Sequence, residues 1–144
     1  MSRGSSLPGL KIAPAALQEM FGHCRKEYPN EACGYLAGRE GRVTRAHPIR
    51  NDAASPTYYE MNPAEQLQAQ RAIREEGLEH LAVYHSHVAT EAFPSRRDVE
   101  RATEVQEIFD GHYVLVTLKD AGMLRARAFR IRDGHVAEER LVEE

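Results

Sequence analysis

The chain has 144 residues, of which 42% are hydrophobic and 28% are charged. This length and composition suit one globular domain with a single core and are atypical of disordered chains. The formal net charge of −3 argues against a nucleic-acid-binding surface, because phosphate contacts favour clustered lysine and arginine. The sequence lacks the roughly 18 consecutive apolar residues of a membrane span, and its start lacks a signal-peptide core. We therefore expect a cytoplasmic protein that binds neither nucleic acid nor membranes.

The first part of the chain alternates between strand-like and helix-like patterns. Residues 1–8 are rich in Gly and Ser, so we expect a disordered tail ahead of a domain that spans 9–144. After a short strand at 10–13, Pro14 suits the first turn of a helix with apolar residues at helical spacing. Two further strands are predicted at 32–37 and 43–49.

The second part continues this alternation. Asn62 and Pro63 are typical of a helix start, and Gly77 follows the predicted end at Glu76. Ser95 can cap a further helix that ends between Ala102 and Phe109. The remaining strands are predicted at 57–61, 78–87, 112–119, 124–131 and 136–141, the last after a hairpin turn at Asp133-Gly134. This order predicts one mixed α/β domain with helices packed on a mostly antiparallel sheet.

The segment that carries chemistry contains His85, His87, Ser95 and Asp98. Residues two apart in a strand project from the same face, so the two histidines can offer their imidazoles to one ion. Asp98 falls in the first turn of the helix that Ser95 begins. Two neutral imidazoles and one carboxylate form a three-ligand zinc set that leaves a fourth position for water.

Each part of this pattern also has a simpler explanation. Ser95 and Asp98 alone resemble a helix-capping pair. The basic residues Arg96, Arg97 and Arg101 are interrupted by acidic residues and are interpreted as a solvated helix face. The occurrence of two histidines, a serine and an aspartate at these spacings nevertheless favours a metal site.

The pattern H-x-H-x7-S-x2-D resembles the motif of the JAMM metallopeptidase family, also called MPN-plus. That family places a glutamate at the start of an early strand, and residues 29–36 resemble this segment, with Glu31 in the glutamate's position. Residues 55–59, 65–67 and 84–95 are more similar to one bacterial branch, the Mec-type peptidases, which release cysteine from the C-terminus of a ubiquitin-like sulfur-carrier protein. Many relatives have proline where this chain has Val88, a difference that affects the loop and leaves the ligands intact.

The resemblance, which covers residues 10–142, implies a fold of the cytidine-deaminase-like type and one zinc ion per chain. His85, His87 and Asp98 would hold this ion. Glu31 would take a proton from the attacking water and deliver it to the leaving amine, and Ser95 would stabilise the oxyanion. The implied partner is a sulfur-carrier protein with a C-terminal Gly-Gly tail, which can bind by adding a strand to an exposed sheet edge.

Other functions remain open at this point. Cys33 with a histidine could form a thiol peptidase pair, although a predicted buried strand is a poor place for a reactive thiolate. The same metal chemistry could instead remove a ubiquitin-like modifier from lysine side chains of proteins. A catalytically inactive MPN scaffold is the non-enzyme alternative, and it is disfavoured because every expected ligand is present. Tyr58 and Tyr59 either line the substrate side or pack in the core.

Overall fold

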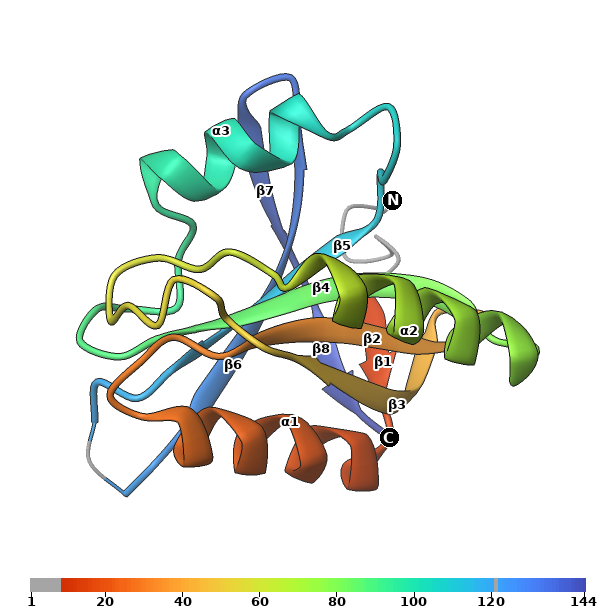
Figure 1. The fold of residues 1–144 in the computed structure, drawn as a ribbon, viewed down its shortest axis with the longest axis horizontal. Helices are drawn as coiled ribbons and strands as arrows, with labels where there is room; N and C mark the ends of the chain where they lie inside the picture. The colour runs from red at the N-terminus through yellow and green to blue at the C-terminus, as the bar shows by residue number, and fades with distance from the viewer. Residues whose placement is uncertain (1–8, 121) are drawn as a thin grey trace, which may run out of the picture.

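The computed structural model describes residues 9–120 and 122–144, so the tail predicted at 1–8 lies outside the described residues. The described residues form three helices and eight strands in one mixed α/β domain (Figure 1). The bounds are β1 (Leu10–Ile12), α1 (Pro14–Glu27), β2 (Cys33–Arg39), β3 (Arg42–Ile49), α2 (Pro63–Glu75), β4 (Glu79–His87), α3 (Arg96–Glu104), β5 (His112–Thr117), β6 (Arg125–Arg132), β7 (His135–Glu139) and β8 (Leu141–Glu143). None of the described helices is both long enough and apolar enough to span a membrane.

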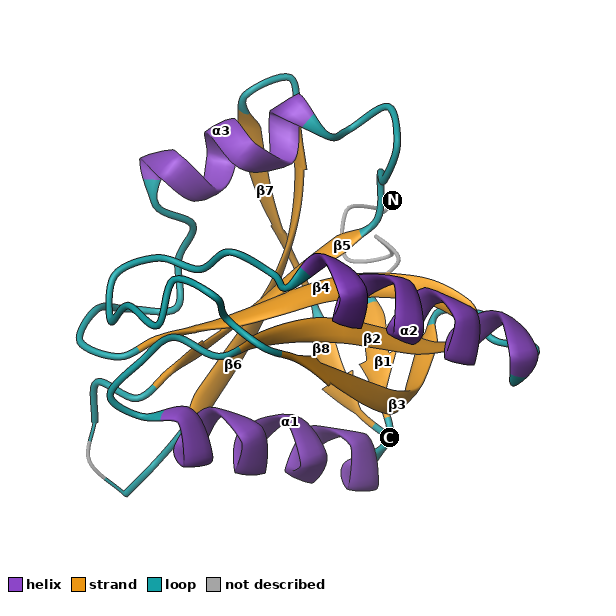
Figure 2. Cartoon of the chain, in the orientation of Figure 1, coloured by secondary structure: helices purple, strands orange, loops and turns teal. Residues whose placement is uncertain are grey.

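The sheet lies between two layers of helix, with α1 on one face and α2 and α3 on the other (Figure 2). The apolar stripe predicted for the first helix is the surface that α1 buries, and Met20 and Cys24 are fully covered. Successive residues of β4 contribute to opposite layers, because strand side chains alternate between faces. Val83 belongs to the core under α2 and α3, and Tyr84 belongs to the core under α1.

All eight strands belong to one sheet in the order β7-β6-β5-β4-β2-β3-β1-β8. Four of the seven pairings are antiparallel, and β4 pairs in parallel with β5. The prediction of one strand at 136–141 is wrong, because Arg140 separates β7 from β8 and the two strands occupy opposite edges. A single residue can join opposite edges only if the sheet curls until those edges approach each other.

The prediction of a strand at 57–61 is also wrong. This segment belongs to an irregular loop, residues 50–62, in which only Met61 makes a bridge, to Asn51. The buried side chain of Asn51 supplies hydrogen bonds that strand pairing would otherwise supply. Its Oδ1 accepts the N–H groups of Ala53 and Glu60. The β-prone residues of the segment therefore obtain backbone hydrogen bonds without joining the sheet.

Candidate active site

β4 carries the two histidines of the motif at its C-terminal end. Because Val83 faces α2 and α3, His85 and His87 point to the same side, and Ser86 points toward α1. His85 is 2% exposed and His87 is 6% exposed. Buried imidazoles need polar partners. The candidate partner is Asp98, which belongs to α3.

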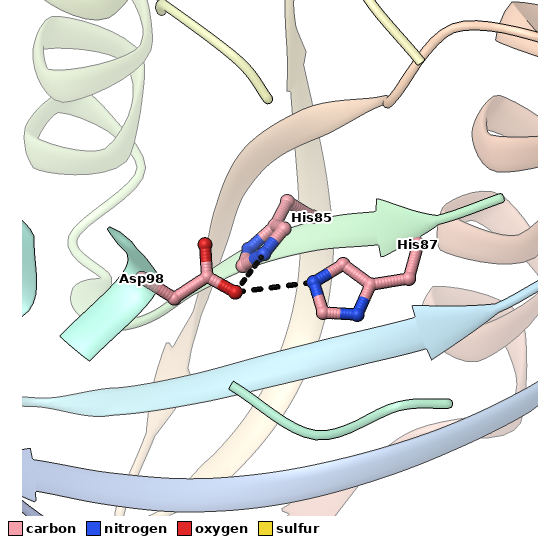
Figure 3. A group of neighbouring side chains, drawn as sticks. All are labelled: His85, His87 and Asp98. Carbon is pink, nitrogen blue, oxygen red and sulfur yellow. Dashed lines mark hydrogen bonds and ion pairs between the residues drawn. The ribbon is translucent and has the colours of Figure 1, made fainter. Parts of the chain in front are cut away.

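Asp98 reaches the histidines from the first turn of α3. Ser95 Oγ accepts the Asp98 N–H at 3.1 Å, and Asp98 Oδ2 accepts the Ser95 N–H at 2.9 Å. The same Oδ2 lies 3.1 Å from Nε2 of His85 and 3.1 Å from Nε2 of His87 (Figure 3). Capping and ligand placement are therefore compatible, since the cap turns the Asp98 carboxylate toward the imidazoles.

The three side chains form a candidate metal site, with ligand atoms within 4.8 Å of one another. In a tetrahedral zinc site with metal–ligand distances near 2.0 Å, neighbouring ligand atoms lie roughly 3.3 Å apart. The separations from Asp98 Oδ2 are close to this value. Both ring nitrogens of His85 are buried without a hydrogen-bond partner among the described residues, and a metal at Nε2 would give one of them a partner.

Hydrogen bonding and charge prepare these groups to bind a cation. His87 Nδ1 lies 2.8 Å from the carbonyl oxygen of Glu91, which can only accept, so Nδ1 carries a proton and Nε2 is the nitrogen that faces Asp98 and would bind a metal. Burial would raise the pKa of Asp98, but the two imidazoles outweigh burial and hold that pKa well below its usual range. Burial lowers the pKa of His85. An ionised Asp98 and a neutral His85 at neutral pH are the protonation states that metal ligands require.

Glu31 precedes β2, the strand beside β4, and Cys33 in β2 pairs with His85. The Glu31 side chain is 4% exposed, and burial raises the pKa of its carboxyl to about 7, while the charge of His87 acts in the opposite direction. The backbone on both sides of this residue is fixed. Its N–H donates to the backbone carbonyl of Ser55 at 2.9 Å, and its carbonyl accepts from Asn51 Nδ2 at 3.0 Å. A carboxyl group with this pKa can both accept and return a proton near neutral pH.

Ser86, between the two histidines, joins the segment that leads from Glu31 into β2 to the strand that carries the ligands, β4. Its Oγ accepts the Ala32 N–H at 2.8 Å, and its own N–H donates to the Ala32 carbonyl at 3.0 Å. The Ser86 side chain is fully buried. Sequence reasoning assigned this residue no role beyond pointing away from the histidines, because its partner, Ala32, lies 54 residues away in the chain.

Ser86→Ala is expected to lower the free energy of unfolding by about 1–3 kcal/mol, because the buried Ala32 N–H loses its side-chain acceptor. Urea denaturation measures this change. Ser55→Ala is the control, since the Ser55 hydroxyl bonds only within its own loop, and its effect is expected to stay within about 0.5 kcal/mol. An equal free energy of unfolding for Ser86→Ala and the wild type would show that the hydrogen bond from the Ala32 N–H to Ser86 does not stabilise the fold.

Arg101 is a further part of the site that sequence reasoning missed, and it contacts Tyr59, for which the sequence left a substrate-side and a core position open. The buried Tyr59 ring lies 4.7 Å from the His85 ring, centroid to centroid. The Arg101 guanidinium lies 4.3 Å from the Tyr59 centroid and donates to the Tyr59 carbonyl. Interpreting Arg101 as part of a solvated helix face is therefore wrong. The wide spacing of Tyr59, His85 and Arg101 in the sequence contains no signal that they meet.

Cys33 is not placed as a nucleophile. It is fully buried, its Sγ donates to the Ile49 carbonyl at 3.4 Å, and burial raises the pKa of its thiol to about 12. A thiol with this pKa is almost entirely protonated at neutral pH, so it has little thiolate character. The geometry disfavours the thiol peptidase alternative.

Comparison with known proteins agrees with the geometry of the site. Residues 13–132 match the family described as prokaryotic homologues of the JAB domain. The chain belongs to this family. It is 45% identical over 132 residues to the CysO-cysteine peptidase of Mycobacterium tuberculosis, an alignment that covers 90% of this chain and 88% of that protein. It is also 35% identical over 121 residues to the desampylase of Haloferax volcanii, covering 79% and 84% of the two chains.

A structural relative extends the comparison to three dimensions. The solution structure of a protein from Desulfitobacterium hafniense superimposes with a TM-score of 0.80 at 33% sequence identity, and the match covers 94% of this chain and 92% of that one. Together with the candidate His-His-Asp metal site, family membership makes this JAB-domain chain an enzyme of the JAMM peptidase type. The inactive scaffold, which typically lacks the ligands, is not supported.

Proposed function

We propose that this JAB-family protein is a zinc peptidase that hydrolyses the bond after the C-terminal Gly-Gly of a ubiquitin-like sulfur-carrier protein and releases cysteine. The observation that carries the proposal is the meeting of His85, His87 and Asp98 beside Glu31, in a chain 45% identical to a CysO-cysteine peptidase. The relative's printed name supports the substrate class. The two cysteines are free and buried, which suits a reducing cytoplasmic setting.

The donor set suits one zinc ion per chain, held by two neutral imidazoles and one carboxylate. A zinc ion there supplies Lewis acidity, which acidifies water and polarises a carbonyl oxygen. Glu31 takes a proton from the attacking water as the new C–O bond forms at the Gly carbonyl. It then delivers that proton to the leaving amine as the C–N bond breaks. The products are a carrier that ends in a Gly carboxylate and free cysteine.

Ser95 is proposed to assist at the oxyanion. Its hydroxyl oxygen accepts the Asp98 N–H, which leaves the hydroxyl proton available for donation. One such donor directed at developing negative charge contributes substantially to rate. The roles of Glu31 and Ser95 rest on this geometry together with the JAMM resemblance.

A second candidate keeps the chemistry and changes the substrate. The similarity to a desampylase favours an isopeptidase that removes a ubiquitin-like modifier from proteins. The alignment with the CysO-cysteine peptidase is longer and has the higher identity, so cysteine release is the leading proposal.

The two candidates predict different preferred substrates. Zinc-loaded protein is expected to shorten a carrier that ends in Gly-Gly-Cys by one cysteine residue, as read by intact mass. A carrier with a bulky residue in place of either glycine should resist cleavage, because an extended Gly-Gly passes where side chains would clash. Changes on the carrier's globular surface should mainly raise KM.

The comparison substrate is the same carrier joined through Gly-Gly to a lysine side chain, tested under identical conditions. Chelator should stop cleavage and added zinc should restore it. Preferential cleavage of the lysine-linked conjugate would overturn the cysteine-releasing function and favour the isopeptidase.

A further inference from the structure

Two arginines of α3 make cation–π contacts with two consecutive tyrosines beside the candidate metal site. Arg101 lies over the Tyr59 ring, and Arg97 lies over the Tyr58 ring with its Cζ 4.8 Å from the centroid. Tyr59 in turn packs on His85. Because residues four apart in a helix lie on one face, both guanidinium groups point at the loop 50–62. Two positive charges are thereby held at the edge of the site.

Arg97 differs from its basic neighbours in having uncommitted donors. Arg96 pairs with Glu100 at 3.5 Å, and Arg101 donates to the Tyr59 carbonyl. Across residues 9–120 and 122–144, Arg97 has neither an ion pair nor a hydrogen bond, and it is exposed. Contact with the face of Tyr58 orients the guanidinium plane but leaves its N–H groups free at the edges.

Arg97 lies at the border of the candidate metal site. It immediately precedes Asp98, and its partner Tyr58 immediately precedes the tyrosine that covers His85. Its charge is felt inside the site, since Arg97 is among the groups that lower the pKa of Glu31 against the effect of burial. A guanidinium with free donors at this border suits an anionic group of the substrate.

We propose that Arg97 is a specificity-determining residue that binds the free α-carboxylate of the substrate's C-terminal amino acid. This inference rests on the proposed function, in which the leaving residue is a C-terminal cysteine with its carboxylate one residue from the cleaved bond. A guanidinium fork matches a carboxylate with two parallel hydrogen bonds. A lysine side chain in an isopeptide linkage presents methylene groups there and no anion. Arg97 therefore selects terminal-residue release over isopeptide cleavage.

The test uses zinc-loaded enzyme and one carrier prepared with two ends, Gly-Gly-Cys as the free acid and Gly-Gly-Cys as the C-terminal amide. For the wild type, kcat/KM is expected to be about 10- to 100-fold higher for the acid, as befits charge-assisted hydrogen bonds. Arg97→Gln should reduce the acid-to-amide ratio to within about threefold by slowing the acid and sparing the amide. Arg97→Lys should recover part of the preference because it keeps the charge.

Arg96→Gln is the matched control, because Arg96 is an exposed neighbour on the same helix turn that pairs with Glu100 instead. It should keep the wild-type acid-to-amide ratio. An equal rate for acid and amide in the wild type, or an unchanged ratio in Arg97→Gln, overturns the role of Arg97 while cysteine release stands. Cleavage of the lysine-linked conjugate alone, with both Gly-Gly-Cys carriers intact, overturns the proposed function itself.

Discussion

The wild-type chain is expected to retain about one zinc ion, and His85→Ala, His87→Ala and Asp98→Ala are each expected to lose most of it. Each variant leaves two protein ligands, and two cannot hold the ion against washing. Asp98 Oδ2 lies 3.1 Å from Nε2 of each histidine, close to the separation of neighbouring ligand atoms in a tetrahedral zinc site, so each of the three side chains is placed to contribute one bond. Metal content after zinc loading and desalting, measured by plasma mass spectrometry, checks this result.

Two further variants make the metal experiment decisive. His135→Ala is the control, because His135 is exposed at the start of β7 and should leave zinc content unchanged. Asp98→Asn keeps the size of the side chain, so lost zinc at an unchanged melting temperature separates ligand loss from misfolding. A correctly folded wild type that retains no metal would contradict the candidate site.

Glu31→Gln is expected to reduce hydrolysis by about 10²-fold or more while zinc content stays near one per chain. Glutamine keeps the shape of the side chain and cannot take a proton from water, so only the proton transfer is lost. Single-turnover rates on the preferred carrier, measured beside metal content, test this separation of base from ligand. Glu75→Gln makes the same chemical change at an exposed position of α2 and should leave the rate unchanged.

Ser95→Ala is expected to reduce the rate of hydrolysis by less than Glu31→Gln does. The expected reduction is about 10- to 10³-fold, as for the loss of one oxyanion donor. The variant also removes the cap of α3 and the hydrogen bond that orients Asp98. Zinc content and melting temperature therefore have to be measured with the rate.

Full activity in Glu31→Gln would show that another group activates the water.

The elements with local signals were predicted well from the sequence. Pro14 and the Asn62-Pro63 pair mark the observed starts of α1 and α2, and Asn62 caps the second of these by accepting the Glu65 N–H. The turn at Asp133-Gly134 joins β6 to β7, and both of its residues have positive φ. Such features depend on residues within one turn of the chain, so the sequence contains them.

The sequence alone also singled out His85, His87 and Asp98, because strand alternation and the start of one helix bring them to one side of the sheet over a short stretch. Only the tertiary structure decided what surrounds them. Tyr59 reaches His85 through a loop that was predicted to be a strand, and Asn51 determines that loop's course. Ser86 bonds to Ala32, just ahead of the neighbouring strand, and Arg97 and Arg101 contact Tyr58 and Tyr59. These contacts join residues far apart in the chain, and their energies depend on a packing that no local pattern encodes.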